Sequence, residues 1–332
     1  MINKYIFFRT DRIGDFLLSA ILIKSIKRSD KKSFITVVAS KKNYSYIKNF
    51  EFIDEVILFP NSYLSKIIFY FKFIYKKFYL IGILDGKKRS MYFSFLTRSK
   101  YKILFTYNKF YKTFFNYFFF KIFYDNDCKY KISETKEFLR LLDFELEPKD
   151  FNTIDKNTVL MRDFKIPFSN RFSLLHFDEK WIFNDYIKNY TSVEPESESL
   201  LITFFEQLIT KTNNDLYISS GNLTNKFIFF LKKKFIQIDH NIYKLQFKNN
   251  KIIFFDNINF LDLEKLILNS HLLITCHGAP SHVAGSFNKK IIDIIDHSEL
   301  DFFNKWTHHF TNYTSIKRDN FKNLADKIIN SF

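Results

Sequence analysis

The sequence predicts an α/β protein with two doubly wound, Rossmann-like domains. At 332 residues the chain exceeds the size of about 100–200 residues of a usual single domain, so we expect two hydrophobic cores. Short apolar runs that continue without polar alternation recur in both halves, and helix-length stretches separate them. Such runs are typical of parallel strands that helices cover on both faces.

The first half contains five apolar runs that we predict to be strands: Tyr5–Arg9, Phe34–Ala39, Glu55–Phe59, Leu80–Leu84 and Lys102–Phe105. The stretches Asp15–Arg28 and Tyr63–Lys77 are long enough for helices and complete repeated βα units. After Tyr107, aromatic-rich sequence that we expect to be helical continues through Leu142. The polar stretch Glu145–Lys156 then marks the domain boundary, which gives a first domain of residues 1–155.

The second domain, residues 156–332, repeats the alternation. Its predicted strands are Phe172–Phe177, Leu216–Ser219, Ile252–Phe255, Leu272–Cys276 and Ile291–Ile295. A final helix near Asn320–Asn330 either completes this domain or packs back on the first. We expect the acidic patch Glu194–Glu198 to be a solvated loop. Two doubly wound domains that face each other leave a cleft where strand ends and helix N-termini meet, and such a cleft is a natural ligand site.

The chain carries a formal net charge of +16, for which the sequence leaves two explanations open. One is electrostatic steering toward the phosphates of a nucleic acid, an anionic membrane or a charged substrate. The other is an A/T-rich genome, because residues with A/T-rich codons are abundant and only nine of the 51 basic residues are arginine. No nucleic-acid-binding motif is recognised, so we expect no nucleic-acid partner.

Several features predict where the protein acts. The first residues place charges inside the only apolar run, so we predict no signal-peptide core and expect a cytoplasmic protein. The most lipid-like stretch, Phe110–Tyr124, is interrupted by Lys112 and Lys121 and is not expected to span a bilayer. This stretch and Ser65–Lys77, both aromatic and basic, either lie as peripheral contacts on an anionic leaflet of the inner membrane or pack against their own sheet.

The first segment that could carry chemistry is Arg9–Asp15, directly after the first predicted strand. A strand that ends in a polar turn with a glycine, Gly14, and leads into a helix places the carboxylate of Asp15 at the carboxyl edge of the sheet. Helix capping explains an aspartate at this position without any catalytic role. The local sequence leaves both interpretations open.

The segment Leu272–Ala284 predicts a strand, a tight turn and a helix N-terminus. Free amides at such a helix start bind a diphosphate, and a small residue such as Gly278 lets the ligand approach the backbone. The chain has only six glycines, which favours a close approach at this one. An ordinary βα turn with Pro280 in the first helical turn explains the same pattern without a ligand. Lys180, which follows another strand, is either a point charge for the same phosphates or a solvent-facing lysine.

These segments resemble glycosyltransferase family nine, the ADP-heptose:lipopolysaccharide heptosyltransferases. The sequence RTDRIGDFLLSAILIKSIKR is similar to the opening motif of that family, and Phe52–Ile57 resembles the entry to its third strand. Tyr79–Phe105, Leu174–Trp181 and Leu272–Ala284 resemble three further blocks, in the same order along the chain.

The resemblance implies a GT-B fold in which the first domain binds the acceptor and the second binds the nucleotide sugar. It implies a metal-independent, inverting transfer of a sugar, with heptose from ADP-heptose as the leading candidate, to an anionic, lipid-linked lipopolysaccharide-core acceptor or a related surface glycan. No cofactor besides the nucleotide sugar is expected. Asp15 would be the catalytic base. The implied donor-phosphate contacts are Lys180, His277, Gly278, Ala279, Ser281 and His282, and the implied acceptor contacts are Arg9, Arg12, Gly14, Lys87, Lys88 and Arg89.

The sequence departs from the family pattern in the donor region. His277 stands where the family has an aspartate, and Ala279 stands where it has a glycine. The loop before Lys180 is shorter, and Gly221–Asn225 contains no counterpart of a glutamate often found there. The donor sugar therefore stays open, and two other functions remain: a non-catalytic protein that binds nucleic acid or membrane through its charge, and another nucleotide-sugar enzyme such as an epimerase.

Overall fold

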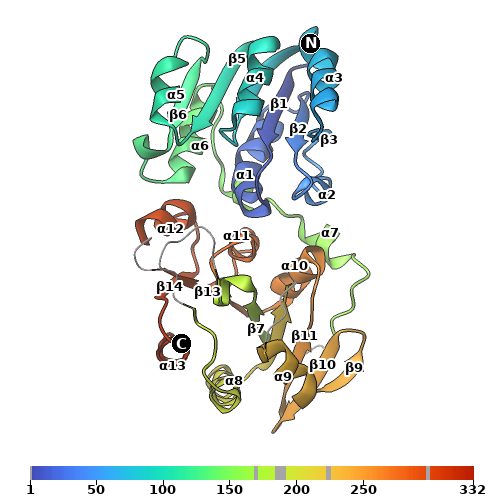
Figure 1. The fold of residues 1–332 in the computed structure, drawn as a ribbon, viewed down its shortest axis with the longest axis vertical. Coiled ribbons are helices and arrows are strands. Elements are labelled where there is room, and N and C mark those ends of the chain that lie inside the picture. The colour runs from blue at the N-terminus through green and yellow to red at the C-terminus, as the bar shows by residue number, and fades with distance from the viewer. Residues whose placement is uncertain (1, 168–170, 184–191, 222–225, 297–299) are drawn as a thin grey trace. The chain divides into compact units, whose positions relative to one another are not determined.

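The computed structural model describes residues 2–167, 171–183, 192–221, 226–296 and 300–332 (Figure 1). The chain divides into two compact units, Met1–Thr153 and Ile154–Phe332. Among the described residues, no helix combines the length and the apolar character that crossing a bilayer requires.

Unit 1 is built on a six-stranded sheet in which all neighbouring strands are parallel. Its strands are β1 (Lys4–Arg9), β2 (Phe34–Ala39), β3 (Glu55–Leu58), β4 (Lys77–Ile83), β5 (Arg98–Thr106) and β6 (Lys121–Tyr124). The strand order β3-β2-β1-β4-β5-β6 is that of a doubly wound sheet. The strands are added outward from β1 to one edge and then, from β4 on, to the other edge, so the switch point lies between β1 and β4. Ligands bind at the carboxyl ends of strands at such a switch point.

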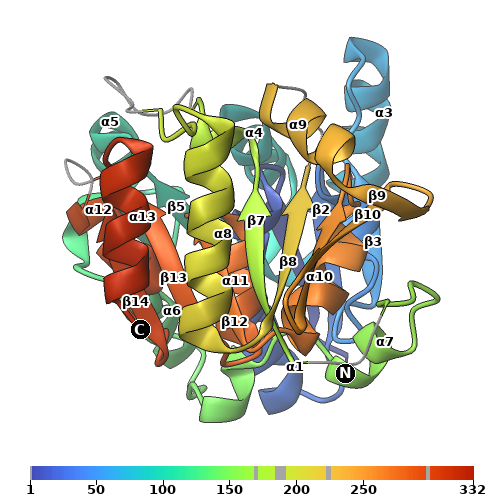
Figure 2. The same cartoon turned by 90° about the horizontal axis from the view of Figure 1, so that it is seen from below.

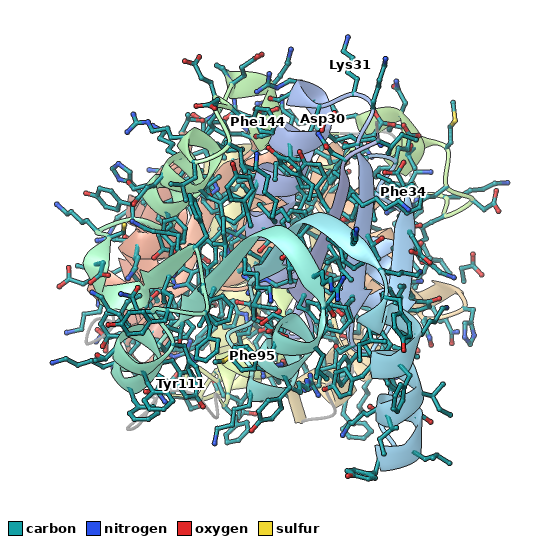
Figure 3. All side chains as sticks on the ribbon, turned by 90° about the horizontal axis from the view of Figure 1, so that it is seen from above. Asp30, Lys31, Phe34, Phe95, Tyr111 and Phe144 are labelled. Atoms are coloured by element: carbon teal, nitrogen blue, oxygen red, sulfur yellow. The ribbon has the colours of Figure 1, made fainter. Side chains whose placement is uncertain are left out.

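Helices cover both faces of this sheet. They are α1 (Ile13–Ser29), α2 (Tyr44–Ile47), α3 (Tyr63–Ile74), α4 (Lys88–Leu96), α5 (Lys109–Phe114) and α6 (Lys131–Arg140), with 3-10 turns η1 (Asp125–Asp127) and η2 (Pro148–Phe151). Helix α1 contacts α6, and α3 contacts α4. In Figure 3, Phe95 of α4 and Tyr111 of α5 lie on the side opposite to Asp30 and Phe144, which follow α1 and α6.

Unit 2 is built on an eight-stranded sheet of order β14-β13-β12-β7-β8-β11-β10-β9. Its strands are β7 (Phe172–Phe177), β8 (Asp215–Ser220), β9 (Ile236–Asp239), β10 (Ile242–Phe247), β11 (Asn250–Phe255), β12 (Leu272–Cys276), β13 (Lys290–Ile295) and β14 (Tyr313–Lys317). Only β10 runs antiparallel to its neighbours, β9 and β11.

The helical elements of unit 2 are α7 (Lys156–Leu160), η3 (Glu179–Trp181), α8 (Glu198–Thr212), α9 (Lys226–Lys234), α10 (Phe260–Asn269), α11 (Ala279–Ser286), α12 (Leu300–Thr307) and α13 (Phe321–Asn330). Helix α13, predicted near Asn320–Asn330, packs against α8 and β14, and the rings of Phe204 and Phe321 lie 5.5 Å apart (Figure 2). Both partners belong to unit 2, and the packing of this helix back on the first domain stays an expectation.

The predicted helical stretch from Tyr107 to Leu142 is wrong in its middle. Helix α5 ends at Phe114, and Lys121–Tyr124 forms the edge strand β6 before α6 begins at Lys131. Because the aromatic run is continuous, the sequence shows no change from the apolar periodicity of a helix to that of a strand. Pairing with β5 selects the strand conformation. β9, β10 and β14 were not predicted, because these strands are largely exposed or half-exposed and have no continuous apolar run.

Candidate functional site

The β1–α1 turn, Thr10–Arg12, lies at the switch point of the unit 1 sheet. Arg9, the last residue of β1, is buried and uses its guanidinium to hold this turn. It donates hydrogen bonds to the carbonyl oxygen of Asp15 at 3.0 Å, to that of Leu84 at 2.5 Å and to the carboxylate of Asp11 at 2.9 Å. Arg9, an expected acceptor contact, therefore joins the ends of β1 and β4 to the start of α1.

Asp15 is the third residue of α1 and is half-buried. Its carboxylate accepts a hydrogen bond from the backbone N–H of Arg12 at 3.3 Å. This contact satisfies one of the amides that have no partner at the start of a helix, as the capping interpretation requires. The same contact also fixes the carboxylate beside the turn, so capping and a catalytic role are compatible. Arg12 is exposed and Gly14 is half-buried in the first turn of α1.

Thr10 connects the turn to the basic segment after β4. Its hydroxyl donates to Asp85 at 2.5 Å, Arg89 donates to that hydroxyl at 2.7 Å, and the ammonium of Lys87 donates to the Thr10 carbonyl at 3.0 Å. Two of the three predicted acceptor contacts in this segment thus converge on the β1–α1 turn, whereas Lys88 is exposed at the start of α4.

Asp11 is a residue of this turn that the sequence analysis did not select. Burial, together with the charges of Asp15 and Asp85, raises its pKa to about 6 against the opposing effect of Arg9. Its Oδ1 atom is buried and has no hydrogen-bond partner among the described residues. A single carboxylate in a polar turn gives no local sequence signal, because its environment comes from segments far along the chain.

In unit 2 the β12–α11 turn, His277 and Gly278, brings predicted residues from two sequence blocks together. A β-carbon built on Gly278 would lie 2.0 Å from the ammonium nitrogen of Lys180. That ammonium donates to the carbonyl oxygen of His277 at 3.0 Å and lies 3.5 Å from a carboxylate oxygen of Asp178. In the structure the group that approaches Gly278 closely is Lys180, and the approach of a diphosphate stays a prediction.

Asp293 of β13 organises the side chains of this turn, and the sequence analysis missed it. This carboxylate is fully buried and lies 2.6 Å from Nδ1 of His277. It also accepts hydrogen bonds from the hydroxyl of Ser281 at 2.9 Å and from that of Tyr313 at 3.0 Å. An ionised carboxylate is only an acceptor, so Nδ1 of His277 carries the proton. Ser281, an expected donor contact, is buried and supports the turn from within.

The remaining predicted donor residues begin α11. Ala279 is half-buried at the first helical position, and His282 is buried one turn further on. Burial, reinforced by the neighbouring His277, lowers the pKa of His282 well below its ordinary value. His282 is therefore neutral at pH 7 and can contact a phosphate through an N–H but not as a cation.

The short segment that carries Lys180 is held by residues from other strands. The guanidinium of Arg318 donates to the carbonyl oxygens of Lys180 and Trp181 and to the sulfur of Cys276 at 3.3 Å. The indole N–H of Trp181 donates to the carbonyl of His176 at 2.9 Å. Arg318 lies far from Lys180 in sequence, and for this reason no spacing pattern indicated it.

The two turns offer different chemistry. The β12–α11 turn combines the amides of a helix N-terminus with Lys180, which suits an anionic ligand such as a diphosphate. The β1–α1 turn offers the carboxylates of Asp11 and Asp15, which suit proton transfer. Within the described residues, no group of three or more histidine, cysteine or acidic side chains is placed to hold a metal ion. Of the segment Gly221–Asn225, the last four residues lie outside the described residues.

Comparison with known proteins bears on the fold. No family model matches the sequence, and no curated protein matches it. Among solved structures, a glycosyl transferase family 9 protein from Veillonella parvula is 14% identical, with a TM-score of 0.63 over 95% of this chain and 86% of the other. The E. coli heptosyltransferase WaaC with ADP is 9% identical, with a TM-score of 0.66 over 99% of both chains.

A UDP-GlcNAc 2-epimerase from Methanocaldococcus jannaschii is also similar, at 10% identity and a TM-score of 0.57 over 99% of this chain and 92% of the other. The prediction of a GT-B fold made of two α/β units is confirmed by these likenesses and by the two sheets. Because transferases and an epimerase share the fold, the fold does not choose between their activities.

Proposed function

We propose that the protein is a glycosyltransferase that moves a sugar from a nucleotide diphosphate sugar to a glycan acceptor. The leading donor is ADP-heptose, and the leading acceptor is an anionic lipopolysaccharide core or a related surface glycan. The observation that supports the proposal most is the meeting of Lys180 with His277 and Gly278 at the N-terminus of α11. The similarity of the fold to heptosyltransferases is consistent with it.

In this proposal the second unit holds the donor. The Lys180 ammonium and the amide of Ala279 face the diphosphate, which gains negative charge as it leaves. The amide of Gly278 donates to the hydroxyl of Ser281 and holds the turn. Asp293 keeps His277 in one orientation, so that its Nε2 is turned to the same ligand. The Lys180 ammonium lies 3.5 Å from the carboxylate of Asp178, so its positive charge is shared between this carboxylate and the bound diphosphate.

The first unit holds the acceptor and supplies the base. Asp15 takes the proton of the attacking hydroxyl while the acceptor oxygen bonds to the anomeric carbon. The bond from that carbon to the diphosphate oxygen breaks, its electron pair stays with the diphosphate, and the anomeric configuration inverts. Lys87 and Arg89, anchored on Thr10, provide positive charge for an anionic acceptor. No metal ion takes part in this scheme.

The first test is a thermal-shift screen with ADP-, GDP-, UDP- and CMP-sugars. Ligands that bind only the folded protein raise its melting temperature, so one nucleotide class should stabilise the protein. Stabilisation by none of the four contradicts the proposal.

The fold likeness to an epimerase supports a second candidate, an enzyme that converts one nucleotide sugar into another. An epimerase changes its nucleotide sugar without any acceptor. Incubation with the stabilising nucleotide sugar alone, followed by chromatography, separates the two: a new sugar isomer supports the epimerase, and product only after an acceptor glycan is added supports the transferase.

A further inference from the structure

The segment between β3 and α6 has an unusual balance of charge. From Val56 to Tyr124 the sequence contains thirteen lysines and arginines and one acidic residue, Asp85. Asp85 accepts hydrogen bonds from Thr10 and Ser90, so its carboxylate is engaged beside the β1–α1 turn. The helices α3, α4 and α5 of this segment therefore carry no acidic side chain.

Helix α3 is apolar on two opposite faces. Phe69 and Phe73 are buried in the core of unit 1. Leu64, Ile68, Phe71 and Tyr75, spaced at i, i+4, i+7 and i+11, form a stripe on the other side of the helix and are between 61% and 91% exposed. One apolar face is enough to fix a helix on its sheet, so the outer stripe is not explained by the packing of unit 1.

The exposed apolar side chains continue onto the neighbouring elements of the same layer. Phe93 of α4 contacts the rings of Phe69 and Phe73, and Phe95 contacts those of Phe115 and Phe118. Figure 3 shows Phe95 and Tyr111 on this side of the sheet. Six large apolar side chains on these elements are exposed: Tyr92, Leu96, Phe110, Phe114, Tyr117 and Phe118. These six residues and the stripe of α3 together form a surface that we call the aromatic face.

Lysines border the aromatic face. Lys72 and Lys76 lie beside the stripe of α3, with their ammonium groups near the ring of Phe73, and Lys109 begins α5. All three are exposed. Aromatic and aliphatic side chains bordered by lysines match the interface of a bilayer, where rings sit among headgroups and ammonium groups meet lipid phosphates.

We propose that the aromatic face binds the surface of a bilayer that contains anionic phospholipids. The aliphatic members Leu64, Ile68 and Leu96 favour lipid over nucleic acid, because single-stranded nucleic acid is bound by stacking on rings and by arginine. The absence of acidic residues from α3–α5 removes repulsion from lipid phosphates. The binding extends beyond the transferase reaction and does not depend on it, although it would bring unit 1 to a lipid-linked acceptor.

Flotation with vesicles tests the apolar part. The protein should float with vesicles of equimolar phosphatidylcholine and phosphatidylglycerol and much less with phosphatidylcholine alone. The pair Ile68→Ser and Phe71→Ser should lower the partition coefficient at least about tenfold, because both side chains leave the interface. The matched pair Phe229→Ser and Ile236→Ser, equally exposed in unit 2, should leave it unchanged.

A second pair tests the charges. Lys72→Gln with Lys76→Gln should weaken binding to the anionic vesicles by about tenfold or more, with a smaller loss at high salt. Lys233→Gln with Lys234→Gln, two exposed lysines in the last turn of α9, removes the same charge and should have little effect.

Three results would overturn the proposal: no flotation with anionic vesicles, equal losses in test and control variants, or salt-sensitive binding of RNA in place of vesicles. Circular dichroism of each variant confirms that it is folded. The nucleotide-sugar screen is carried out without lipid, so failure of the proposed function leaves the vesicle result intact and failure of vesicle binding leaves the screen intact.

Discussion

The ammonium nitrogen of Lys180 lies 2.0 Å from the point where Gly278 would carry a β-carbon. These residues are almost a hundred positions apart, and the contact is possible only because residue 278 has no side chain. The φ angle of Gly278 is 175°, which is extended backbone that any residue adopts, so the requirement for glycine here comes from space and not from backbone conformation. This contact therefore links the Lys180 segment to the helix N-terminus that we propose as the diphosphate site.

Gly278→Ala should displace Lys180 and weaken nucleotide binding. The end of a lysine side chain moves at low cost, so we expect the fold to survive and the affinity for the nucleotide to fall about tenfold. Isothermal titration calorimetry measures the change. Gly221→Ala is the matched control, because a β-carbon at Gly221 would meet no atom of the described residues within 4 Å. An unaltered affinity in Gly278→Ala would remove Lys180 from the donor site.

Asp15→Asn should reduce turnover by about 10²–10⁴-fold, which is the usual contribution of a general base, while nucleotide affinity stays nearly intact. Asp262 provides the control, because it occupies the same position of α10 and accepts a hydrogen bond from its cap residue, Asn259. Asp262→Asn should lose a comparable capping interaction without loss of turnover. Equal rates in both variants would assign Asp15 to helix capping alone.

Asp11 should make the stability of the protein depend on pH. Its pKa is raised to about 6 in the folded protein, so folding favours the protonated form, and this stabilisation is lost as the pH rises from about 4 to above 6. Asp11→Asn has no group to titrate. The unfolding free energy of the variant minus that of the wild type should therefore increase by at most about 3 kcal/mol between pH 4 and pH 7. Urea unfolding at the two pH values measures it, and a constant difference contradicts the assignment.

Asp293→Asn should destabilise unit 2 and disturb His277. The buried carboxylate accepts hydrogen bonds from three side chains, and an amide in its place turns an N–H toward one of these donors. We expect the unfolding free energy to fall by about 1–3 kcal/mol and nucleotide affinity to fall with it. Tyr313→Phe removes one of the donors and leaves His277 in place, so this variant should lose stability but keep its affinity. If Tyr313→Phe weakens binding equally, His277 has no separate part in it.

The sequence predicted the fold where hydrophobic periodicity is strong. β1 is buried from Tyr5 onward, β7 and β12 are buried throughout, and their uninterrupted apolar runs predict parallel strands directly. β6 was missed because Lys121–Tyr124 continues an aromatic run that has no change of pattern at its start. A strand of this kind is selected by pairing with β5, which is a tertiary interaction.

The candidate site was predictable where its residues follow a strand along the chain, and not where they come from distant segments. Gly278 and Asp15 stand next to the end of a strand, and this local context is visible in the sequence. Asp293 of β13 contacts His277 of the β12–α11 turn, and Arg318, directly after β14, contacts the Lys180 segment and Cys276. Only the order of strands in the sheet brings these two residues there. The raised pKa of Asp11 likewise results from burial in the folded protein and from the nearby charges of Asp15 and Asp85, which together outweigh the lowering effect of Arg9.

Arg318 follows β14 directly, and its guanidinium anchors the segment of Lys180. During synthesis on the ribosome, β7 and β12 emerge well before this arginine, so the anchor that Arg318 provides forms only after the final strand has joined the sheet. Nascent chains released before residue 318 should therefore hold the Lys180 segment less firmly even though the central strands of unit 2 are present.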